Sequence, residues 1–359
     1  YSDMIVKKIG KHMLEDTLFL QCIFRIGSIF ALFPWNVKTC EVFIQHTLMI
    51  ILNIATITSV YVSIEKDGDS IYSGQILVFV HSAFHLTLSI SYFVTLVLNK
   101  NRWKRFFITF SRIDKNLGKC YISRKTIALK SMSWIFLLAL GLSVFISLLQ
   151  FFSKLVFVTY MMLFIELFII TMFIFEASEM VNNRLIKCQK YLDLTCKNRI
   201  NVKEDFIKNI KRIESAHRDI FLIIEILNSA FGVQILLLFV YDFLETLADI
   251  NYALDNNASF TIKWDALYLF VICAMSISLA IAGDKIEKAG YNLINKCHIL
   301  EVEVENTTTK EILQDLSSFL EDLRPTLTVA GFIDLNRTVI PLLLSTVTSY
   351  AIILIQLKL

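Results

Sequence analysis

Long stretches without charged residues alternate with charged stretches along the chain. Two apolar stretches, 155–175 and 220–241, hold one acidic residue each, Glu166 and Glu225. Five more hold no charge at all: 42–64, 70–99, 131–153, 266–283 and 338–357. Each is close to the ~20 residues that an α-helix needs to cross a bilayer, and backbone polar groups in lipid must be paired within the segment. The sequence therefore predicts seven membrane-spanning helices.

Helical periodicity continues outside several of these stretches. The helix of 155–175 is expected to run on through 176–196 and to break at the polar segment 197–202. A further helix then leads into 220–241. Apolar residues at helical spacing mark the extensions on both sides of the break and after 283: Phe206, Ile210, Ile213, His217, Ile286, Leu293, Cys297 and Leu300.

A short amphipathic helix is expected before the last apolar stretch. Thr308 and Glu311 have the spacing of a capping box, and Pro325 is expected to end this helix. Its apolar stripe consists of Ile312, Leu316, Phe319, Leu320 and Leu323. Apolar faces of this kind need partners. We expect the extensions to form a bundle that also holds an oligomer together, and packing within one subunit is the alternative.

The apolar stretch 18–33 does not follow the pattern of the others. Arg25 lies near its middle and Pro34 follows it. A charge at the centre of a membrane span is costly. We therefore expect a helix that dips into the membrane or lies on it, without crossing.

Composition supports a membrane protein over a soluble one. The chain has 359 residues, of which 55% are hydrophobic, and its mean hydropathy is +0.60. Of the 35 Lys and Arg residues, 31 fall on one side of the predicted spans, and the other side has Lys66, Lys154, Lys263 and Lys358. The positive-inside rule then places the N-terminus in the cytoplasm and the C-terminus outside. No cysteine lies in a predicted outer loop, so we expect no external disulfide.

The end of the chain resembles the signature of the insect gustatory receptors. Leu335-Asn336-Arg337-Thr338 precedes the last span, which ends in Ser349-Tyr350, five apolar residues and Gln356-Leu357. The family has Thr-Tyr, five apolar residues and Gln-Phe. Leu357 therefore departs from the family at a position that bears on its gate. The length, the seven spans and the inverted topology agree with the resemblance over the whole chain.

The resemblance implies an all-α membrane protein that works as a tastant-gated, non-selective cation channel. It also implies a homotetramer or mixed tetramer in the plasma membrane of sensory neurons, with membrane lipid around it and no cofactor. Its seventh helix would be split into a cytosolic half and a pore-lining half. The corresponding segments are a cytosolic and membrane-dipping segment (1–38), helices one to six with the ligand pocket (39–283), cytosolic anchor helices (284–334) and the pore helix (335–359).

In such a channel, one face of the last helix must be in contact with water. Ser345, Thr348, Ser349, Ile352 and Gln356 follow spacings of three and four, so they share one stripe. Four copies of Gln356 could form a polar ring, and Ile352 or Leu357 a hydrophobic constriction that gates by dewetting. Close packing of small residues between helices is the alternative. Acidic residues beside the outer loops, Asp242 and Glu245 among them, would favour cations.

A tastant arrives from outside, so the pocket is expected among the outer halves of spans two to six. Aromatic, amide and carboxylate side chains there suit a sugar, through stacking and hydrogen bonds, or a protonated bitter compound, through cation–π contact. For each of them, helix packing or interfacial anchoring is the alternative. The candidate ligand-binding residues are Glu166, Gln234, Trp264, Tyr241, Asp242, Tyr160, Gln150, His85 and Tyr268.

Other classes fit the sequence less well. A G-protein-coupled receptor would have the opposite orientation, and an odorant-receptor-type channel shares the fold but ends differently. A transporter would be expected to have internal repeats. His81 and His85 are spaced for a shared metal, but no third ligand with suitable spacing accompanies them. We therefore expect no enzyme, no metal site and no nucleic-acid partner.

Overall fold

The computed structural model describes residues 15–29, 102–103, 105–118, 124–148, 154–197, 203–254 and 262–358, with a few positions between 47 and 91. The predicted spans 42–64 and 70–99 therefore lie mostly outside the described residues. So do the boundary between residues 38 and 39 and two of the candidate ligand-binding residues, Gln150 and His85.

The described chain is almost entirely helical. Its labelled helices are α2 (Glu15–Ile29), α5 (Arg124–Leu148), α6 (Lys154–Lys197), α7 (Lys203–Leu254), α8 (Ile262–Glu303), α9 (Thr307–Asp322) and α10 (Val339–Lys358). In the described residues, α6, α7 and α8 are long and apolar enough to cross a membrane, while α5 and α10 contain shorter apolar stretches. The lengths of α6, α7 and α8 confirm the helical extensions predicted from periodicity. The expected break at 197–202 lies, apart from Lys197, outside the described residues.

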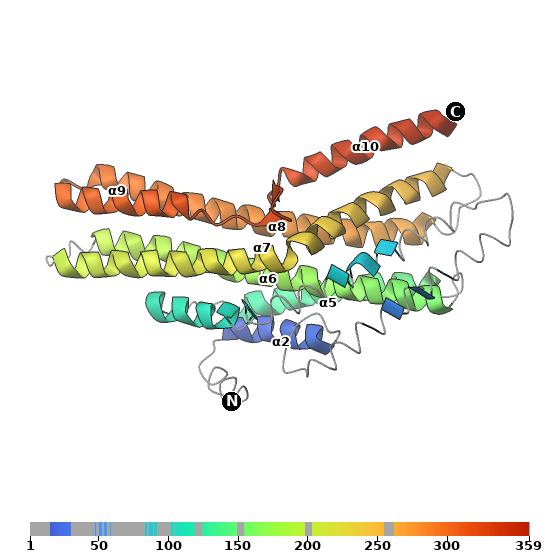
Figure 1. Cartoon of the computed structure of the whole chain (residues 1–359), viewed down its shortest axis with the longest axis horizontal. Coiled ribbons are helices and arrows are strands. Elements are labelled where there is room, and N and C mark those ends of the chain that lie inside the picture. Colours follow the sequence, from blue (N-terminus) through green and yellow to red (C-terminus); the bar gives the residue numbers. More distant parts are fainter. Residues whose placement is uncertain are drawn as a thin grey trace.

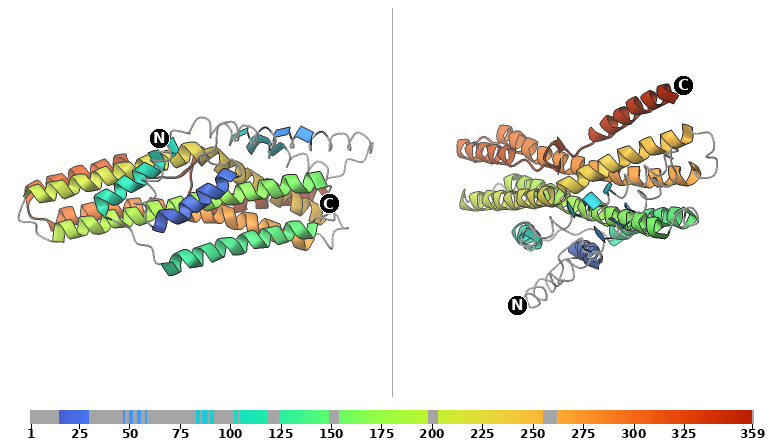
Figure 2. Two further views of the ribbon diagram at one scale, coloured as in Figure 1. Left: turned by 90° about the horizontal axis from the view of Figure 1, so that it is seen from below. Right: turned by 45° about the vertical axis from the view of Figure 1, so that its right-hand side comes forward.

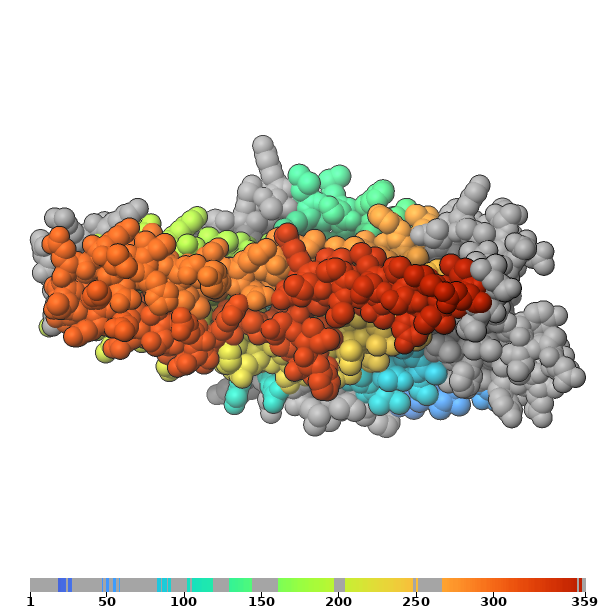
Figure 3. Space-filling model, turned by 90° about the horizontal axis from the view of Figure 1, so that it is seen from above, coloured from blue at the N-terminus to red at the C-terminus, as the bar shows by residue number. Residues whose placement is uncertain are grey.

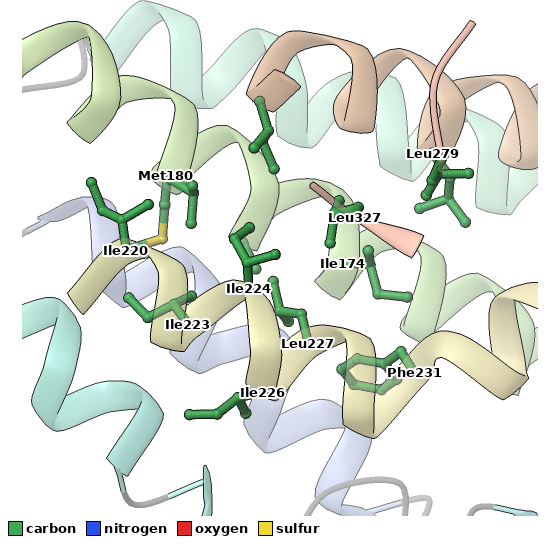
Figure 4. Close-up of a cluster of buried hydrophobic side chains, with 14 of the residues drawn as sticks. Ile174, Met180, Ile220, Ile223, Ile224, Ile226, Leu227, Phe231, Leu279 and Leu327 are labelled. Carbon is green, nitrogen blue, oxygen red and sulfur yellow. The ribbon is translucent and has the colours of Figure 1, made fainter. Parts of the chain in front are cut away.

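The long helices lie side by side and form one core. In one half of the molecule α6, α7, α8 and α9 run together, and in the other half α10 leaves the body of the chain (Figure 1, Figure 2). Where the halves meet, apolar side chains of α6, α7 and α8 enclose Leu327 of the segment before α10 (Figure 4). Ile174, Ile224 and Phe231 are among them. This shared core fixes the start of α10 relative to the long helices.

A buried ion pair attaches a further helix, residues 105–117, to this core. Arg184 of α6 is 1% exposed and binds Asp114 at 2.7 Å, and its guanidinium lies 4.8 Å from the centre of the Phe110 ring. Arg112 binds Asp219 of α7 at 3.1 Å. A buried arginine needs such a partner, because an unpaired charge would be very costly there. Part of the charged segment 100–130 is thus an integral helix of the fold.

The segment between α9 and α10 contains a small hairpin that the all-α prediction did not include. Strands β1 (Thr328–Val329) and β2 (Ile333–Asp334) pair in antiparallel fashion. The turn between them has positive φ angles at Ala330 (52°) and Gly331 (77°), and glycine adopts such angles without strain. An ordered hairpin thus separates α9 from α10.

The start of α9 also differs from the prediction. Asn306 is the N-cap residue, and its side chain accepts a hydrogen bond from the backbone N–H of Thr308 at 3.0 Å. The capping box of Thr308 and Glu311 is therefore wrong, because the helix already begins at Thr307. The end of α9 agrees with the prediction, since the helix stops at Asp322 and Pro325 follows.

Gly283 should be sensitive to substitution. A methyl group there would overlap the backbone carbonyl of Leu335, whereas one at Gly290 would lie 3.1 Å from the side chain of Pro325. Overpacking typically costs about 1–3 kcal/mol, and backbone cannot rotate away as a side chain can. We expect Gly283→Ala to lower the melting temperature in detergent much more than Gly290→Ala. Equal melting temperatures would contradict this close approach.

Candidate functional site

A cluster of buried and half-buried polar side chains joins α7 to α8 in the apolar half of the molecule, which includes 226–247 of α7 and 267–283 of α8. The hydroxyls of Tyr241 and Tyr268 are 2.9 Å apart and form a hydrogen bond. One residue further along α7, the Asp242 carboxylate accepts a hydrogen bond from the Cys273 thiol at 3.2 Å. Both contacts join α7 to α8, so any change in the separation of these helices must alter them.

Aromatic rings surround the two tyrosines. The ring of Phe84 lies 5.2 Å from that of Tyr241, and the ring of Phe164 on α6 lies 6.2 Å from that of Tyr268. Aromatic faces beside hydroxyls suit a small ligand with both apolar and polar groups. The cluster thus joins three helices around mixed aromatic and polar chemistry.

The electrostatics of this half are dominated by carboxylates. Glu166, Asp242 and Glu245 are 5%, 7% and 4% exposed. The described side chains of the same half, 131–143, 161–175, 226–247 and 267–283, include no Lys or Arg. Burying a carboxylate in low-dielectric surroundings is costly unless it is protonated or bound by a donor. The carboxylate oxygens of this region can accept hydrogen bonds from suitable donors, as Asp242 does from Cys273.

The structure brings together only part of the predicted ligand-binding set. Tyr241, Asp242 and Tyr268 belong to the cluster. Glu166 on α6 and Gln234 on α7 are also buried. Trp264 and Tyr160 lie in α8 and α6, but their side chains are outside the described ones, as are Gln150 and His85.

Sequence reasoning missed several residues of the cluster. Glu245 was expected only beside an outer loop, as part of an acidic entrance, yet it is buried on α7, three residues after the predicted ligand-binding residue Asp242. Their spacing of three from each other is helical and was the available signal. Phe84, Phe164 and Cys273 gave no signal, because one aromatic or thiol in an apolar stretch resembles any core residue.

The last helix, α10, lies on the surface of the chain (Figure 3). Its less exposed residues, which include Leu343, Thr346 and Val347, face α7 and α8. The predicted stripe is on the opposite side, where every member is exposed: Ser345, Thr348, Ser349, Ile352 and Gln356. The side chain of Leu357 is outside the described ones. In the described part of the chain, this stripe is left exposed.

The hydroxyl groups of the stripe bond within α10. Ser345 donates to the carbonyl of Leu342 at 2.9 Å, Thr348 to that of Leu344 at 2.7 Å, and Ser349 to that of Ser345 at 2.9 Å. Their hydrogen bonds therefore do not require water. Gln356 differs, because its long amide makes no such bond to another described residue.

One aromatic contact joins the cluster helix to α10. The ring of Phe243 on α7 lies 5.5 Å from that of Tyr350, edge to face. Tyr350 is the tyrosine of the terminal motif, and Phe243 follows Tyr241 and Asp242 directly. Neighbouring side chains of α7 thus face the polar cluster and α10.

These features define a multi-pass helical membrane protein with a buried polar cluster and a final helix exposed along one face. A sequence model of the 7tm chemosensory receptors matches residues 20–359. The chain belongs to this chemosensory receptor family, which confirms the receptor class expected from the motif and excludes an enzyme. A comparison with curated protein sequences found no match.

Solved structures show the same fold. The insect olfactory receptor OR5 from Machilis hrabei is 17% identical, aligns over 96% of this chain and 100% of that chain, and has a TM-score of 0.71. The structure of OR5 in complex with eugenol is 16% identical, with 95% and 98% aligned and a TM-score of 0.67. At this identity the likeness concerns the fold.

The Tyr241–Tyr268 hydrogen bond can be tested by stability. Tyr268→Phe should cost about 0.5–1.5 kcal/mol, the usual net value of one hydrogen bond. The double variant Tyr241→Phe/Tyr268→Phe should cost less than the sum of the two single variants, because both remove the same bond. Melting temperatures in detergent measure this, with exposed Tyr291→Phe on α8 as a control. Additive losses would mean that the hydroxyls do not interact.

Proposed function

We propose that this protein is a gustatory-type receptor, a tastant-gated and non-selective cation channel. The observation that carries the proposal is the stripe of α10, where Ser345, Ser349, Ile352 and Gln356 share a face that the described part of the chain leaves exposed. Several copies of α10 around a central axis would turn this face toward a shared pore. The terminal motif, with Tyr350 and Gln356 in their family positions, favours a gustatory over an odorant type.

The proposal also includes the orientation of the chain in the membrane and its assembly into a tetramer. The bias of Lys and Arg supports a cytoplasmic N-terminus and an external C-terminus. In that orientation the parts of α6, α7 and α8 beyond their apolar halves, together with α9, form a cytosolic anchor bundle. Four subunits, identical or mixed, would meet there and along α10. The location is the plasma membrane of a sensory neuron.

The ligand site of the proposal is the polar cluster of α7 and α8. A sugar would hydrogen-bond to Asp242, Glu245 and the tyrosine hydroxyls, and a protonated bitter compound would pair with a carboxylate and stack on the rings. OR5, the fold relative, binds eugenol, a small aromatic molecule. That likeness supports a small organic ligand among the helices and does not choose between these two chemistries.

Gating would follow from a shift in the relative populations of the closed and open states of the channel. A ligand can open the channel only by binding the open state more tightly than the closed one. Ligand contacts to Tyr241 and Asp242 would move α7, and Phe243 would transmit the movement to Tyr350 on α10. The ring contact thus gives the cluster a direct connection to the pore helix.

The deciding experiment is expression of the chain alone in oocytes. Whole-cell current is recorded while sugars, bitter compounds, amino acids and volatile aromatics are perfused. A fast inward cation current that survives G-protein blockade would support the channel and name its ligand class. A current that requires G-protein signalling would overturn the proposal in favour of a G-protein-coupled receptor, and activation by volatiles alone would favour an odorant type.

Cysteine accessibility along α10 tests the pore-lining face. Ser345→Cys, Ser349→Cys and Ile352→Cys should react with a charged thiol reagent and lose current, because their side chains would face water. Leu343→Cys and Val347→Cys are matched controls on the face toward α7 and α8 and should not react. Block at the control positions but not along the stripe would exclude this orientation of α10.

Substitution of Gln356 tests the polar ring. Gln356→Ala should change the unitary conductance, because the amide of each subunit would otherwise contact the permeating ions. Thr346→Ala, on the opposite face, should leave conductance unchanged. Single-channel recording at equal surface expression measures this, and an unaltered conductance in Gln356→Ala would remove Gln356 from the pore.

Neutralising the buried carboxylates tests the ligand site. Asp242→Asn and Glu166→Gln should each lower agonist potency, by about tenfold if one charge-assisted hydrogen bond to the ligand is lost. Glu225→Gln, an exposed position on α7, is the control. Dose–response curves at matched surface expression measure the effect. Unshifted curves would assign these carboxylates a structural role.

A further inference from the structure

The linker between α9 and α10, residues 323–338, is held by α7. The Asn228 side chain donates to the carbonyl of Thr326 at 2.9 Å and accepts from the backbone N–H of Thr328 at 2.9 Å. One turn further along α7, the carbonyl of Gly232 accepts from the N–H of Ala330 at 3.0 Å. Because these bonds reach the backbone of the linker, they fix its path across α7.

The end of the linker is attached to α8 by an ion pair. The Asp284 carboxylate accepts from Nε of Arg337 at 2.9 Å. The same carboxylate oxygen also binds Lys288, one turn along α8, at 2.9 Å. Asp284 is buried while both cations are largely exposed. Of its two partners, only Arg337 connects α8 to another element.

The next acidic residue of α8, Glu287, binds both the start and the end of the linker. Oε1 of Glu287 accepts from Arg324 at 2.8 Å, and Oε2 accepts from the Asn336 side chain at 3.1 Å. Arg324 lies at the start of the linker and Asn336 near its end. One carboxylate therefore binds both ends of the linker, and Asn336 lies three residues before Val339, the first residue of α10.

The same turn of α8 is also tied to α5 and α6. Lys285 forms an ion pair with Glu179 of α6, and Glu179 binds Lys130 of α5 at 3.3 Å. Residues 284–287 thus face α6 on one side and the linker on the other. A movement of α8 relative to α6 would therefore change the contacts that Asp284 and Glu287 make with the linker.

We propose that Arg337 is a positioning residue that, through Asp284, sets the direction in which α10 leaves the core. α10 diverges from the long helices (Figure 1), and beyond its first turn none of its described side chains is fully buried, so its direction depends on how that turn is held. The inference rests on the proposed function. A ligand between α7 and α8 displaces α8, and the Asp284–Arg337 pair carries the displacement to α10.

The variant Arg337→Gln isolates this link. It leaves the buried Asp284 carboxylate paired with Lys288, so the protein should fold. Lys288→Gln is the matched control, because it removes a cation from the same carboxylate without touching the linker. Arg337→Lys retains the charge but not the guanidinium geometry and should lie between wild type and Arg337→Gln.

Hydrogen–deuterium exchange of the full chain in detergent tests the positioning role without any ligand. Arg337→Gln should raise exchange of the backbone amides of 336–342 by about fivefold and leave α6 unchanged, since a local contact is lost. Lys288→Gln should exchange like wild type. Unchanged exchange in Arg337→Gln, or an equal rise in Lys288→Gln, would overturn the positioning role.

Single-channel recording of K⁺ current in planar bilayers tests the coupling. With its start released from α8, α10 should fluctuate more freely, and the ligand-free open probability of Arg337→Gln should rise by about threefold or more. Lys288→Gln should match wild type. An unchanged or lower open probability would overturn the coupling role. A wild-type protein that never conducts would count against the proposed function, and the exchange measurement would still decide the positioning role.

Discussion

The architecture depends on three helices that continue past the ends of their apolar stretches. α6, α7 and α8 have 44, 52 and 42 residues. At 1.5 Å per residue, each is roughly twice as long as the ~30 Å hydrocarbon core of a bilayer is thick. Their buried side chains form one cluster along this length, so the polar cluster and the linker that starts α10 are attached to the same continuous helices.

Features that follow from periodicity were accessible from the sequence. The helical extensions of α6, α7 and α8, the amphipathic character of α9 and the common face of Ser345, Ser349 and Gln356 all depend on the spacing of residues along a single helix. Spacing fixes which side chains share a face before any partner is known. The terminal motif added the family, because its residues have a fixed order within one helix.

Features that depend on partners from distant segments were not accessible. Arg184 binds Asp114, which lies seventy positions away in the sequence. The sequence alone does not reveal this partner, so the segment around Asp114 resembles a charged loop. Asp242 and Glu245 were expected near water because they follow the predicted end of a span, yet the length of α7 keeps them inside. The hairpin depends on Gly232 and Gly283, where α7 and α8 allow the linker backbone to approach closely. A glycine in an apolar stretch does not reveal what will approach it.

The internal hydrogen bonds of the α10 hydroxyls affect what this helix can border. Ser345, Thr348 and Ser349 each satisfy their donor on a carbonyl of the preceding turn, so little is lost when water leaves their surface. The same groups retain lone pairs that water can use when it returns. Such a surface can therefore border either lipid or water, because its hydroxyl donors stay bonded in both surroundings. Wetting or drying along α10 would then be decided at Gln356, the one long amide of the stripe, and by the size of its aliphatic neighbours.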